Sequence, residues 1–472
     1  MPLLKPDLCI IGAGSGGLSV AAGAAQMGAS VVLLEADKMG GDCLNYGCVP
    51  SKALIASAHR AESMRTAKEV GIENHTPTIN FESVSSHLNG VIKTIEPHDS
   101  AERFESLGVH VIKEKGTFID PQTVQAGDHQ IKARTFIIAT GSQANIPAIE
   151  GLENTPYLTN ATIFSINELP KHLIILGGGP IGCEMGQAFR RLGSEVTLLQ
   201  RSHILHKEDP ELVAPIIEQL KKEGVTLLEN TQIQKAEHTN GETRITFIQD
   251  GVTKTVTGSH LLVSAGQKPH MKPLNLEAGN ILHTSRGITV NARLRTSNKH
   301  VYAIGDVIGG PQFTHAAGYH AGIVLRNALF KLPAKVSYTA LPRVTYTDPE
   351  LAQVGLTEPE AEAQNIKFET FTSSFERNDR ALCEGRPEGF IKILVTPKGK
   401  ILGASIVGNH AGELISPWTL AIQEGLGVKA LAQCIVSYPT LSEINKRAAS
   451  EYFIPKLASA SLKRVVSVLK RL

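Results

Sequence analysis

Two stretches of the chain share one pattern, and that pattern leaves few folds open. Residues 7–37 and residues 172–202 each begin with a short apolar run, continue through a glycine-rich turn into a small-residue helix, and end in a second apolar run. This is the pattern of a strand–helix–strand unit with parallel strands and a right-handed crossover. Two such units, far apart in the sequence, predict an α/β chain with two parallel-sheet nucleotide-binding domains.

The bulk composition is that of a large globular protein. The chain has 472 residues, of which 42% are hydrophobic and 19% are charged. At roughly 150 residues per domain, this length predicts about three domains. The net charge of +2 gives no argument for nucleic-acid binding, and no nucleic-acid partner is expected. The N-terminal residues enter a strand without a secretory leader, and no apolar run is long enough to span a membrane, so we expect a cytoplasmic protein.

Changes in the pattern along the chain predict a first nucleotide-binding domain that is interrupted by a second. We place the domains at residues 1–150 for the first part of the first domain, 151–270 for the second domain, 271–340 for the remainder of the first domain, 341–455 for a C-terminal α+β domain and 456–472 for a tail.

The first glycine-rich turn predicts a site for a dinucleotide. Gly12 allows the tight turn, Gly14 lets the backbone approach a pyrophosphate, and Gly17 lets the helix pack closely on the strand. Glu35 ends the next strand, where a carboxylate can accept hydrogen bonds from ribose hydroxyls. This motif suits the adenosine half of FAD.

The second motif, Gly177, Gly179 and Gly182, differs at its ribose end. Gln200 stands where the first motif has its carboxylate, and Arg201 follows it. A neutral acceptor beside a guanidinium suits a 2′-phosphate, and Lys207 adds a positive charge, so the motif favours NADPH and leaves NADH as the alternative. In the other interpretation these two basic residues are ordinary surface charges.

The segment GGDCLNYGCVPSK, residues 40–52, contains two cysteines that could form a staple, half of a metal site, a redox couple or two inert thiols. On a regular helix Cys43 and Cys48 would be too far apart for a disulfide, so a bond between them needs a distorted turn, for which Gly47 provides freedom. A strained bridge closing so short a loop suits a shuttle better than a staple. The other cysteines are isolated, which disfavours zinc and gives no metal ligands. We interpret the pair as redox-active.

These motifs resemble those of the class I flavoprotein pyridine nucleotide-disulfide oxidoreductases, a family that includes mercuric reductase and dihydrolipoamide dehydrogenase. The cysteine segment is similar to the family's redox-active segment. ATGSQANIP (139–147), VYAIGDV (301–307) and LPRVTYTDPELAQVGLTE (341–358) are similar to its flavin and dimer-interface motifs. The resemblance implies two Rossmann-like domains, for FAD and NAD(P), with a C-terminal α+β dimerisation domain and a homodimer.

The resemblance also implies a role for each matched residue. Hydride would pass from NADPH to the flavin and on to the disulfide, with Cys48 as the thiolate against the flavin and Cys43 as the thiol that exchanges with the acceptor. Lys52 would lie by the flavin, paired with Glu184. The remaining cofactor-binding residues implied by the resemblance are Gly41, Gly116, Thr140, Gly141, Ser142, Asp306 and His315 toward FAD and Gly266 toward the nicotinamide nucleotide.

Four positions depart from the family pattern. Asp42 replaces a small hydroxyl residue before the first cysteine, Tyr46 replaces an aliphatic residue, and Pro180 stands where several relatives have an aromatic gate. The sequence offers no account of these three. At the fourth position Tyr438 replaces the histidine that, with a glutamate equivalent to Glu443, serves as acid–base pair across the dimer. A tyrosine is a poor base at neutral pH, which disfavours thiol exchange with a dithiol.

We therefore expect a soft metal ion such as Hg(II) or Cu(II), or a disulfide, as the electron acceptor. The alternative within enzymes is dihydrolipoamide dehydrogenase. An alternative of another class is a non-catalytic, membrane-associated assembly subunit, which the intact cysteines and flavin motifs disfavour.

The tail has its own signature. In LKRVVSVLKRL, residues 462–472, leucines and valines recur at helical spacing and four basic residues occupy the rest. This predicts a basic amphipathic helix that either packs on its own dimer or makes peripheral contact with the inner membrane face.

Overall fold

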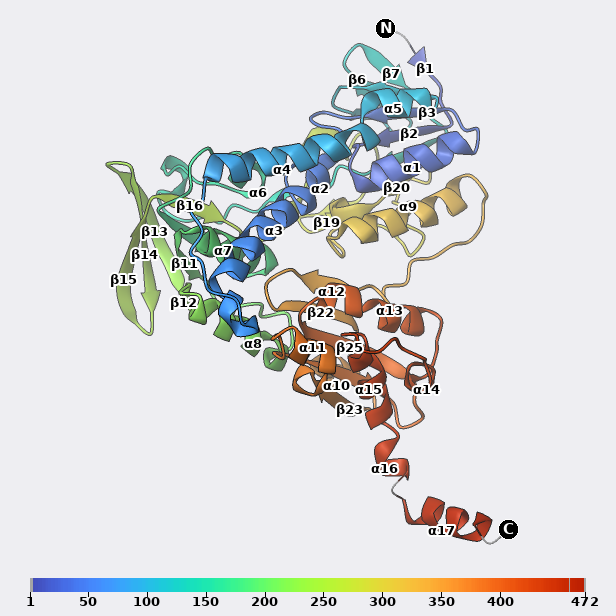
Figure 1. The fold of residues 1–472 in the computed structure, drawn as a ribbon. Coiled ribbons are helices and arrows are strands. Elements are labelled where there is room, and N and C mark those ends of the chain that lie inside the picture. Colours follow the sequence, from blue (N-terminus) through green and yellow to red (C-terminus); the bar gives the residue numbers. More distant parts are fainter. Residues whose placement is uncertain (1–2, 458, 471–472) are drawn as a thin grey trace.

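The computed structural model describes residues 3–457 and 459–470. Its first sheet is fully parallel, and its inner strands β2 (Leu8–Ile11) and β3 (Val31–Leu34) are buried on both faces, as is typical of such sheets. The strand order is β20 (Val301–Ala303), β8 (Thr135–Ile138), β2, β3 and β4 (Val109–Ile112). The helices α1 (Ser15–Gln26) and α9 (Thr314–Ala328) pack on one face (Figure 1).

A second, smaller sheet covers the opposite face. Its order is β1 (Leu3–Leu4), β7 (His129–Ile131), β6 (Thr123–Ala126) and β5 (Thr117–Asp120). Successive residues of β2 alternate between the two layers, because side chains of a strand point to opposite faces. Leu8 and Ile10 pack toward the helices, whereas Cys9 and Ile11 pack toward the small sheet.

The crossover between β3 and β4 contains most of the helices of this part of the chain. They are α2 (Gly41–Asn45), α3 (Cys48–Arg65), α4 (Phe81–Ile95) and α5 (Ala101–Ser106). The side chains of Leu54 and Ala58 on α3 pack in one core with Cys183 and Phe189 of α7 (Pro180–Leu192). The helix that begins with Cys48 is thereby fixed to the second strand–helix–strand unit.

The second unit repeats the design of the first. Its parallel sheet has the order β12 (Thr226–Leu228), β11 (Glu195–Leu199), β10 (His172–Leu176) and β16 (His260–Val263). α7 and α8 (Pro210–Lys222) pack on one face, and an antiparallel sheet packs on the other. That sheet comprises β13 (Gln232–Thr239), β14 (Glu242–Gln249) and β15 (Val252–Gly258).

The second unit lies between two parts of the first in the chain. The chain leaves the first sheet after β8 and returns as β20, which pairs with β8 in parallel. The two-stranded pairing of β9 (Ser142–Ala144) with β17 (Gln267–Pro269) joins the outgoing and returning segments.

The C-terminal domain is an antiparallel sheet with helices against it. The strand order is β21 (Arg343–Thr345), β22 (Glu350–Gly355), β25 (Ile401–Gly408), β24 (Phe390–Val395) and β23 (Glu369–Ser374). The helices are α10 (Glu358–Ala363), α11 (Asp379–Cys383), α12 (Ala411–Leu414), α13 (Ser416–Gln423), α14 (Val428–Ala432) and α15 (Glu443–Glu451). Trp418 is fully buried among them, and its indole N–H donates to Asn445 Oδ1 at 2.8 Å.

The predicted tail helix is present in the described residues. It runs as α17 (Ala460–Leu469) and follows the short α16 (Ile454–Leu457), and Figure 1 shows it projecting away from the C-terminal domain. Arg471 and Leu472, the last residues of the predicted amphipathic pattern, lie outside the described residues. Within the described part of the chain, no helix combines the length and the apolarity that crossing a membrane requires.

Candidate active site

The carboxyl ends of both parallel sheets open on one recess of about 2350 Å³. Among the residues that the sequence predicts to bind a cofactor, only Gly17 and Gly182 do not line it. These two are the third glycines of their motifs, and both lie at the contact between helix and strand. A Cβ atom on Gly17 would stand 1.9 Å from the carbonyl oxygen of Gly12, and one on Gly182 would stand 1.9 Å from that of Gly177.

The first glycine motif fits a dinucleotide. A Cβ on Gly14 would have no neighbour nearer than 3.9 Å, so the backbone at the start of α1 faces open space in the recess. The backbone N–H of Ala13 donates to Glu35 Oε2 at 2.6 Å, which holds the carboxylate at the base of the turn. An anion at this helix N-terminus would meet unpaired N–H groups and the positive end of the helix dipole.

The second glycine motif makes the equivalent backbone hydrogen bond to a neutral side chain. The N–H of Gly178 donates to Gln200 Oε1 at 2.8 Å, at the place where the first motif uses a carboxylate. Arg201, Lys207 and His206 all line this end of the recess. The histidine was not predicted to be a site residue. The second motif thus presents cationic side chains where the first presents an anion.

The flavin-motif residues line the same recess as the two glycine motifs. Asp306 lies in the short 3-10 turn η5 (Gly305–Ile308), and its Oδ2 accepts a hydrogen bond of 2.7 Å from Ser142 Oγ. Burial raises the pKa of this carboxyl. Thr140, Gly141 and His315 also line the recess.

The two cysteines lie on different helices. Cys43 is on α2, Cys48 is the first residue of α3, and Gly47 interrupts the helix between them with a ψ of −107°. A Cβ on Gly47 would stand 2.9 Å from Asp42 Oδ2, so a larger residue would clash there. The break turns both sulfurs toward the recess and toward each other, which a continuous helix would not do.

The two thiols are electrostatically unequal. A hydrogen bond from Cys43 is the main cause that lowers the pKa of Cys48 to about 6, with further help from Thr314 and Lys52 against the effect of burial. The same hydrogen bond, followed by burial, raises the pKa of Cys43. At neutral pH, Cys48 is therefore the thiolate and Cys43 holds the proton.

Lys52 meets its predicted partner. Its Nζ lies 2.9 Å from Glu184 Oε2 and 4.1 Å from the centre of the Tyr346 ring. The other carboxylate oxygen of Glu184 accepts from the backbone N–H of Tyr346 at 3.0 Å. Glu184 is only 6% exposed, so this pair fixes the lysine from the second unit and the C-terminal domain together.

The C-terminal pair lies apart from the thiols of its own chain. Tyr438 is 70% exposed, and its hydroxyl donates to Asp379 Oδ2 at 2.9 Å. That hydrogen bond raises the pKa of Tyr438, so the phenol holds its proton more firmly and even less phenolate is present at neutral pH to act as a base. Glu443 begins α15, and neither Glu443 nor Tyr438 lines the recess. Their action in the site of a partner subunit stays a prediction.

Three contacts of the site were not predicted from the sequence. Thr314 Oγ1 lies 3.4 Å from Cys48 Sγ, Tyr346 lies against Lys52, and Asn160 donates to Asp42. Each partner comes from an element far away in the chain, and none lies in a motif that the sequence analysis linked to the thiols. Only the fold brings them together.

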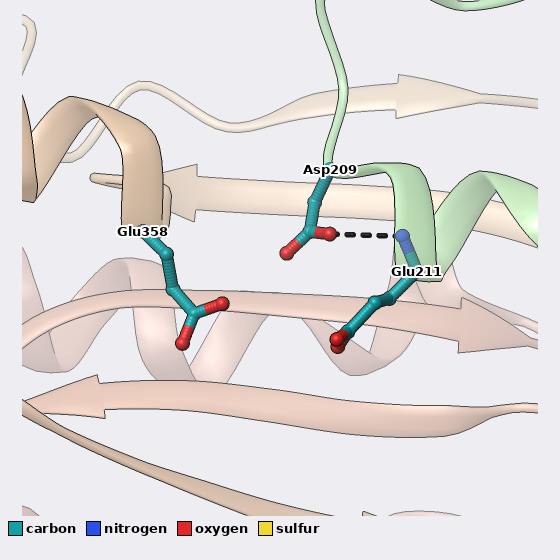
Figure 2. A group of neighbouring side chains, drawn as sticks. All are labelled: Asp209, Glu211 and Glu358. Atoms are coloured by element: carbon teal, nitrogen blue, oxygen red, sulfur yellow. Dashed lines mark hydrogen bonds between the residues drawn. The ribbon is translucent and has the colours of Figure 1, made fainter.

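A cluster of three carboxylates lies outside the recess. Asp209, Glu211 and Glu358 place one oxygen each within 4.8 Å of one another, and Figure 2 shows their carboxylates converging. Lys392 of β24 already satisfies them: its Nζ lies 2.7 Å from Asp209, 2.5 Å from Glu211 and 3.1 Å from Glu358. We call these four residues the Lys392 clasp. It joins the start of α8 to the C-terminal domain.

Two dinucleotide cradles that open on one thiol pair, with a thiolate already favoured at Cys48, define an oxidoreductase that moves electrons between a nucleotide and a dithiol. Comparison with protein families agrees. The chain belongs to the pyridine nucleotide-disulphide oxidoreductase family, whose model matches residues 6–321, and the family's dimerisation domain matches residues 341–449. The family depends on FAD and a pyridine nucleotide, and its dimerisation domain indicates a homodimer.

Relatives with different substrates are about equally similar. Over 446 residues the chain is 34% identical to a mercuric reductase of Staphylococcus aureus, covering 94% of this chain and 82% of the relative. Over 455 residues it is 35% identical to a dihydrolipoyl dehydrogenase of Geobacillus stearothermophilus, covering 94% and 96%. The solved Cu(II) complex of the HOCl-induced flavoprotein disulfide reductase RclA from Escherichia coli matches with a TM-score of 0.85, 26% identity and coverage of 95% and 99%.

Proposed function

We propose that the protein takes hydride from NADPH and delivers two electrons through the Cys43–Cys48 disulfide to a soft metal ion or to a disulfide. The observation that carries this proposal is the placement of both thiols in the recess that both dinucleotide cradles share. FAD, when bound in the first cradle, would supply the two-electron relay between a nicotinamide and a thiol.

The residues of the chain would act in three ways. Thr314 and Lys52 favour the thiolate of Cys48, and the helix N-terminus at which this cysteine stands adds to their effect. Glu184 holds the lysine in place by its ion pair. Cys43 keeps a proton and is the sulfur that attacks the acceptor.

The choice of NADPH is supported by the ribose end of the second cradle. Gln200 is neutral and, unlike a carboxylate, would not repel a 2′-phosphate. Arg201 and Lys207 line the recess and could attract that phosphate through their positive charge. We expect Arg201→Ala to raise the KM for NADPH by on the order of tenfold while the KM for NADH changes little. Lys222→Ala, at the exposed end of α8, is the matched control. An equal effect of Arg201→Ala on both nucleotides would contradict the assignment.

The choice of a soft acceptor is supported by Tyr438 and its hydrogen bond to Asp379. A phenol that holds its proton does not replace a histidine in dithiol exchange, whereas two thiol sulfurs are ligands that soft metal ions prefer. The alternative acceptor reaction is that of a dihydrolipoamide dehydrogenase, which the 35% identity to the Geobacillus enzyme favours.

An acceptor panel separates these reactions. The FAD-loaded dimer is first reduced with NADPH in the absence of oxygen and is then mixed with Hg(II), Cu(II) or glutathione disulfide. In a separate assay of the reverse direction, the oxidised dimer is mixed with dihydrolipoamide and NAD. We expect metal or disulfide reduction that Cys43→Ser and Cys48→Ser both abolish. Fast dihydrolipoamide turnover would overturn the preference for a soft acceptor. A wild-type protein that NADPH cannot reduce would overturn the whole proposal.

We also propose that α17 contacts an anionic lipid surface. Leu462, Val465, Val466 and Leu469 are exposed on it, beside Lys463 and Arg464. We expect the full chain, but not residues 1–455, to bind vesicles with phosphatidylserine, and salt to weaken that binding. Equal binding of both proteins would mean that the helix packs elsewhere.

A further inference from the structure

His320 is a fully buried histidine that lies behind the flavin-motif turn. It belongs to α9, the helix that also brings Thr314 and His315 to the recess, and it is 0% exposed. Its Nδ1 accepts a hydrogen bond of 3.1 Å from the backbone N–H of Gly305, and its Nε2 lies 2.9 Å from the hydroxyl oxygen of Tyr338. Both nitrogens of the buried ring are therefore engaged, one on each side.

These two contacts fix the tautomer of the ring. Burial lowers the pKa of His320 to about 4, so the imidazole is neutral at physiological pH and carries a single N–H group. Because Nδ1 accepts from Gly305, that N–H group is on Nε2 and donates to Tyr338. The opposite tautomer would place two N–H groups against each other at Gly305. The hydroxyl of Tyr338 thus keeps Nδ1 available as an acceptor.

The N–H group that His320 accepts belongs to the turn that presents Asp306. Gly305 is the first residue of η5, and the first N–H groups of a helix have no acceptor within it. A Cβ on Gly305 would stand 3.3 Å from the Cβ of Ala317, so the turn lies directly on α9. Asp306 follows, and Ser142 holds one of its oxygens. The histidine therefore anchors the backbone one residue before the carboxylate that the family resemblance assigns to the flavin.

We propose that His320 is a positioning residue for flavin binding, which fixes the place of the Asp306 carboxylate through the N–H of Gly305. Tyr338 supports it by holding the ring in the tautomer that can accept. The inference rests on the proposed function only for the place of FAD in the first glycine motif. His320 does not line the recess, so it acts through the turn. Without this acceptor the buried N–H of Gly305 would lose its partner, and the turn would move to regain one.

Two substitutions separate this role from the packing of the core. In His320→Asn the side-chain oxygen can stand where Nδ1 accepts from Gly305. In His320→Gln the longer amide reaches toward Tyr338 and leaves Gly305 without its acceptor. The FAD-loaded dimer is diluted, and the flavin that it releases is separated by ultrafiltration and measured by absorbance. We expect release to be on the order of tenfold faster in His320→Gln and within about threefold of the wild type in His320→Asn.

A second readout uses ADP as a probe of the adenosine half of the site. Its affinity for the full-length chain, stripped of FAD, is measured by titration calorimetry. His320→Gln should leave this affinity unchanged, because Glu35 follows β3, and two strands separate β3 from β20, after which the turn begins. Loss of the ADP site together with the FAD site would instead indicate a general disturbance of the domain.

Two neighbouring tyrosines provide a matched pair. Tyr338→Phe removes the acceptor that fixes the tautomer, so FAD release should be about threefold faster. Tyr319→Phe is the control, because the ring of Tyr319 lies 6.1 Å from that of His320 but its hydroxyl accepts from the backbone N–H of Ser337. This variant should release FAD at the wild-type rate.

The outcomes separate the two proposals. FAD release from His320→Gln at the wild-type rate would overturn the inference and leave the proposed function intact. So would equal acceleration in His320→Asn and His320→Gln, or a parallel loss of ADP affinity, since either result would mean that the histidine only packs the core. If the wild type retains FAD that NADPH cannot reduce, the proposed NADPH reaction fails, and the release rates alone decide the role of His320. A wild type that binds no FAD would overturn both.

Discussion

Replacing Lys392 should strongly destabilise the protein, because the Lys392 clasp is buried and charged. The side chain of Lys392 is 3% exposed, and that of Asp209 is 8% exposed. In Lys392→Met the three carboxylates lose their common cation, and at least Asp209 stays buried with no counter-charge. Removing one partner of a buried ion pair typically costs about 3–5 kcal/mol. For a cooperative unit of about 200 residues this corresponds to a midpoint about 6 to 20 °C lower.

The assay is thermal unfolding of the FAD-loaded dimer, followed by far-UV circular dichroism and by flavin fluorescence. The ion pairs raise the pKa of Lys392, so the stabilising contribution is fully present below the unfolded value of 10.5 and is lost as the pH rises through the folded value. The deficit of Lys392→Met should therefore be constant from pH 6 to pH 9. The stability deficit should become smaller toward pH 4, where the carboxylates that have lost their counter-charge become protonated.

Lys398→Met is the matched control, since that lysine is exposed in the turn between β24 and β25 of the same sheet. Its midpoint should stay within about 2 °C of the wild type. A double variant, Lys392→Met with Glu358→Gln, should recover part of the loss. If Lys392→Met unfolds at the wild-type midpoint, the clasp contributes nothing net and the reasoning from burial is wrong.

Two further predictions concern the recess. Gly17→Ala should yield protein without bound flavin, whereas Gly182→Ala should bind flavin that NADPH no longer reduces. The reason is that each new Cβ would collide with the backbone of its own glycine motif only. Absorbance spectra before and after NADPH addition check both variants. In the reduced enzyme the long-wavelength thiolate–flavin band should appear with a midpoint near pH 6, vanish in Cys48→Ser and move to higher pH in Lys52→Met. Since the folded pKa of Cys48 lies below its ordinary value of 9.0, the stability that this thiolate contributes is present above pH 9 and is lost as the pH falls through about 6.

The sequence predicted what local patterns encode. The two strand–helix–strand units follow from glycine spacing and apolar runs, and the fold confirms them. The family was predicted from the resemblance of several motifs, and the family model confirms it. The contact between Lys52 and Glu184, which was predicted only through the family resemblance, is also present. The catalytic roles of these residues and the domain boundaries stay predictions.

Contacts between distant elements that no family motif covers could not be predicted from the sequence. In the sequence, Lys392 is one of many charged residues in predicted strands. Only the packing of β24 near the start of α8 brings its ammonium group within ion-pair distance of three carboxylates. In the same way, only the fold places Asn160 and Gly47 against Asp42. Such side-chain contacts depend on how distant elements pack in the fold, and no local periodicity or motif in the sequence predicts that packing.

The return of the chain to the first sheet as β20 has a consequence for synthesis. β8 ends at Ile138, and its outer neighbour begins only at Val301, after the whole second unit has been made. At roughly 5–20 residues per second, the ribosome needs on the order of ten seconds or more to supply that missing strand. Throughout this time the edge of β8 is unpaired and Asp306 has not been synthesised, and toward its end the second unit is complete, since β16 ends at Val263. Nascent chains should therefore bind pyridine nucleotide before they can retain a flavin.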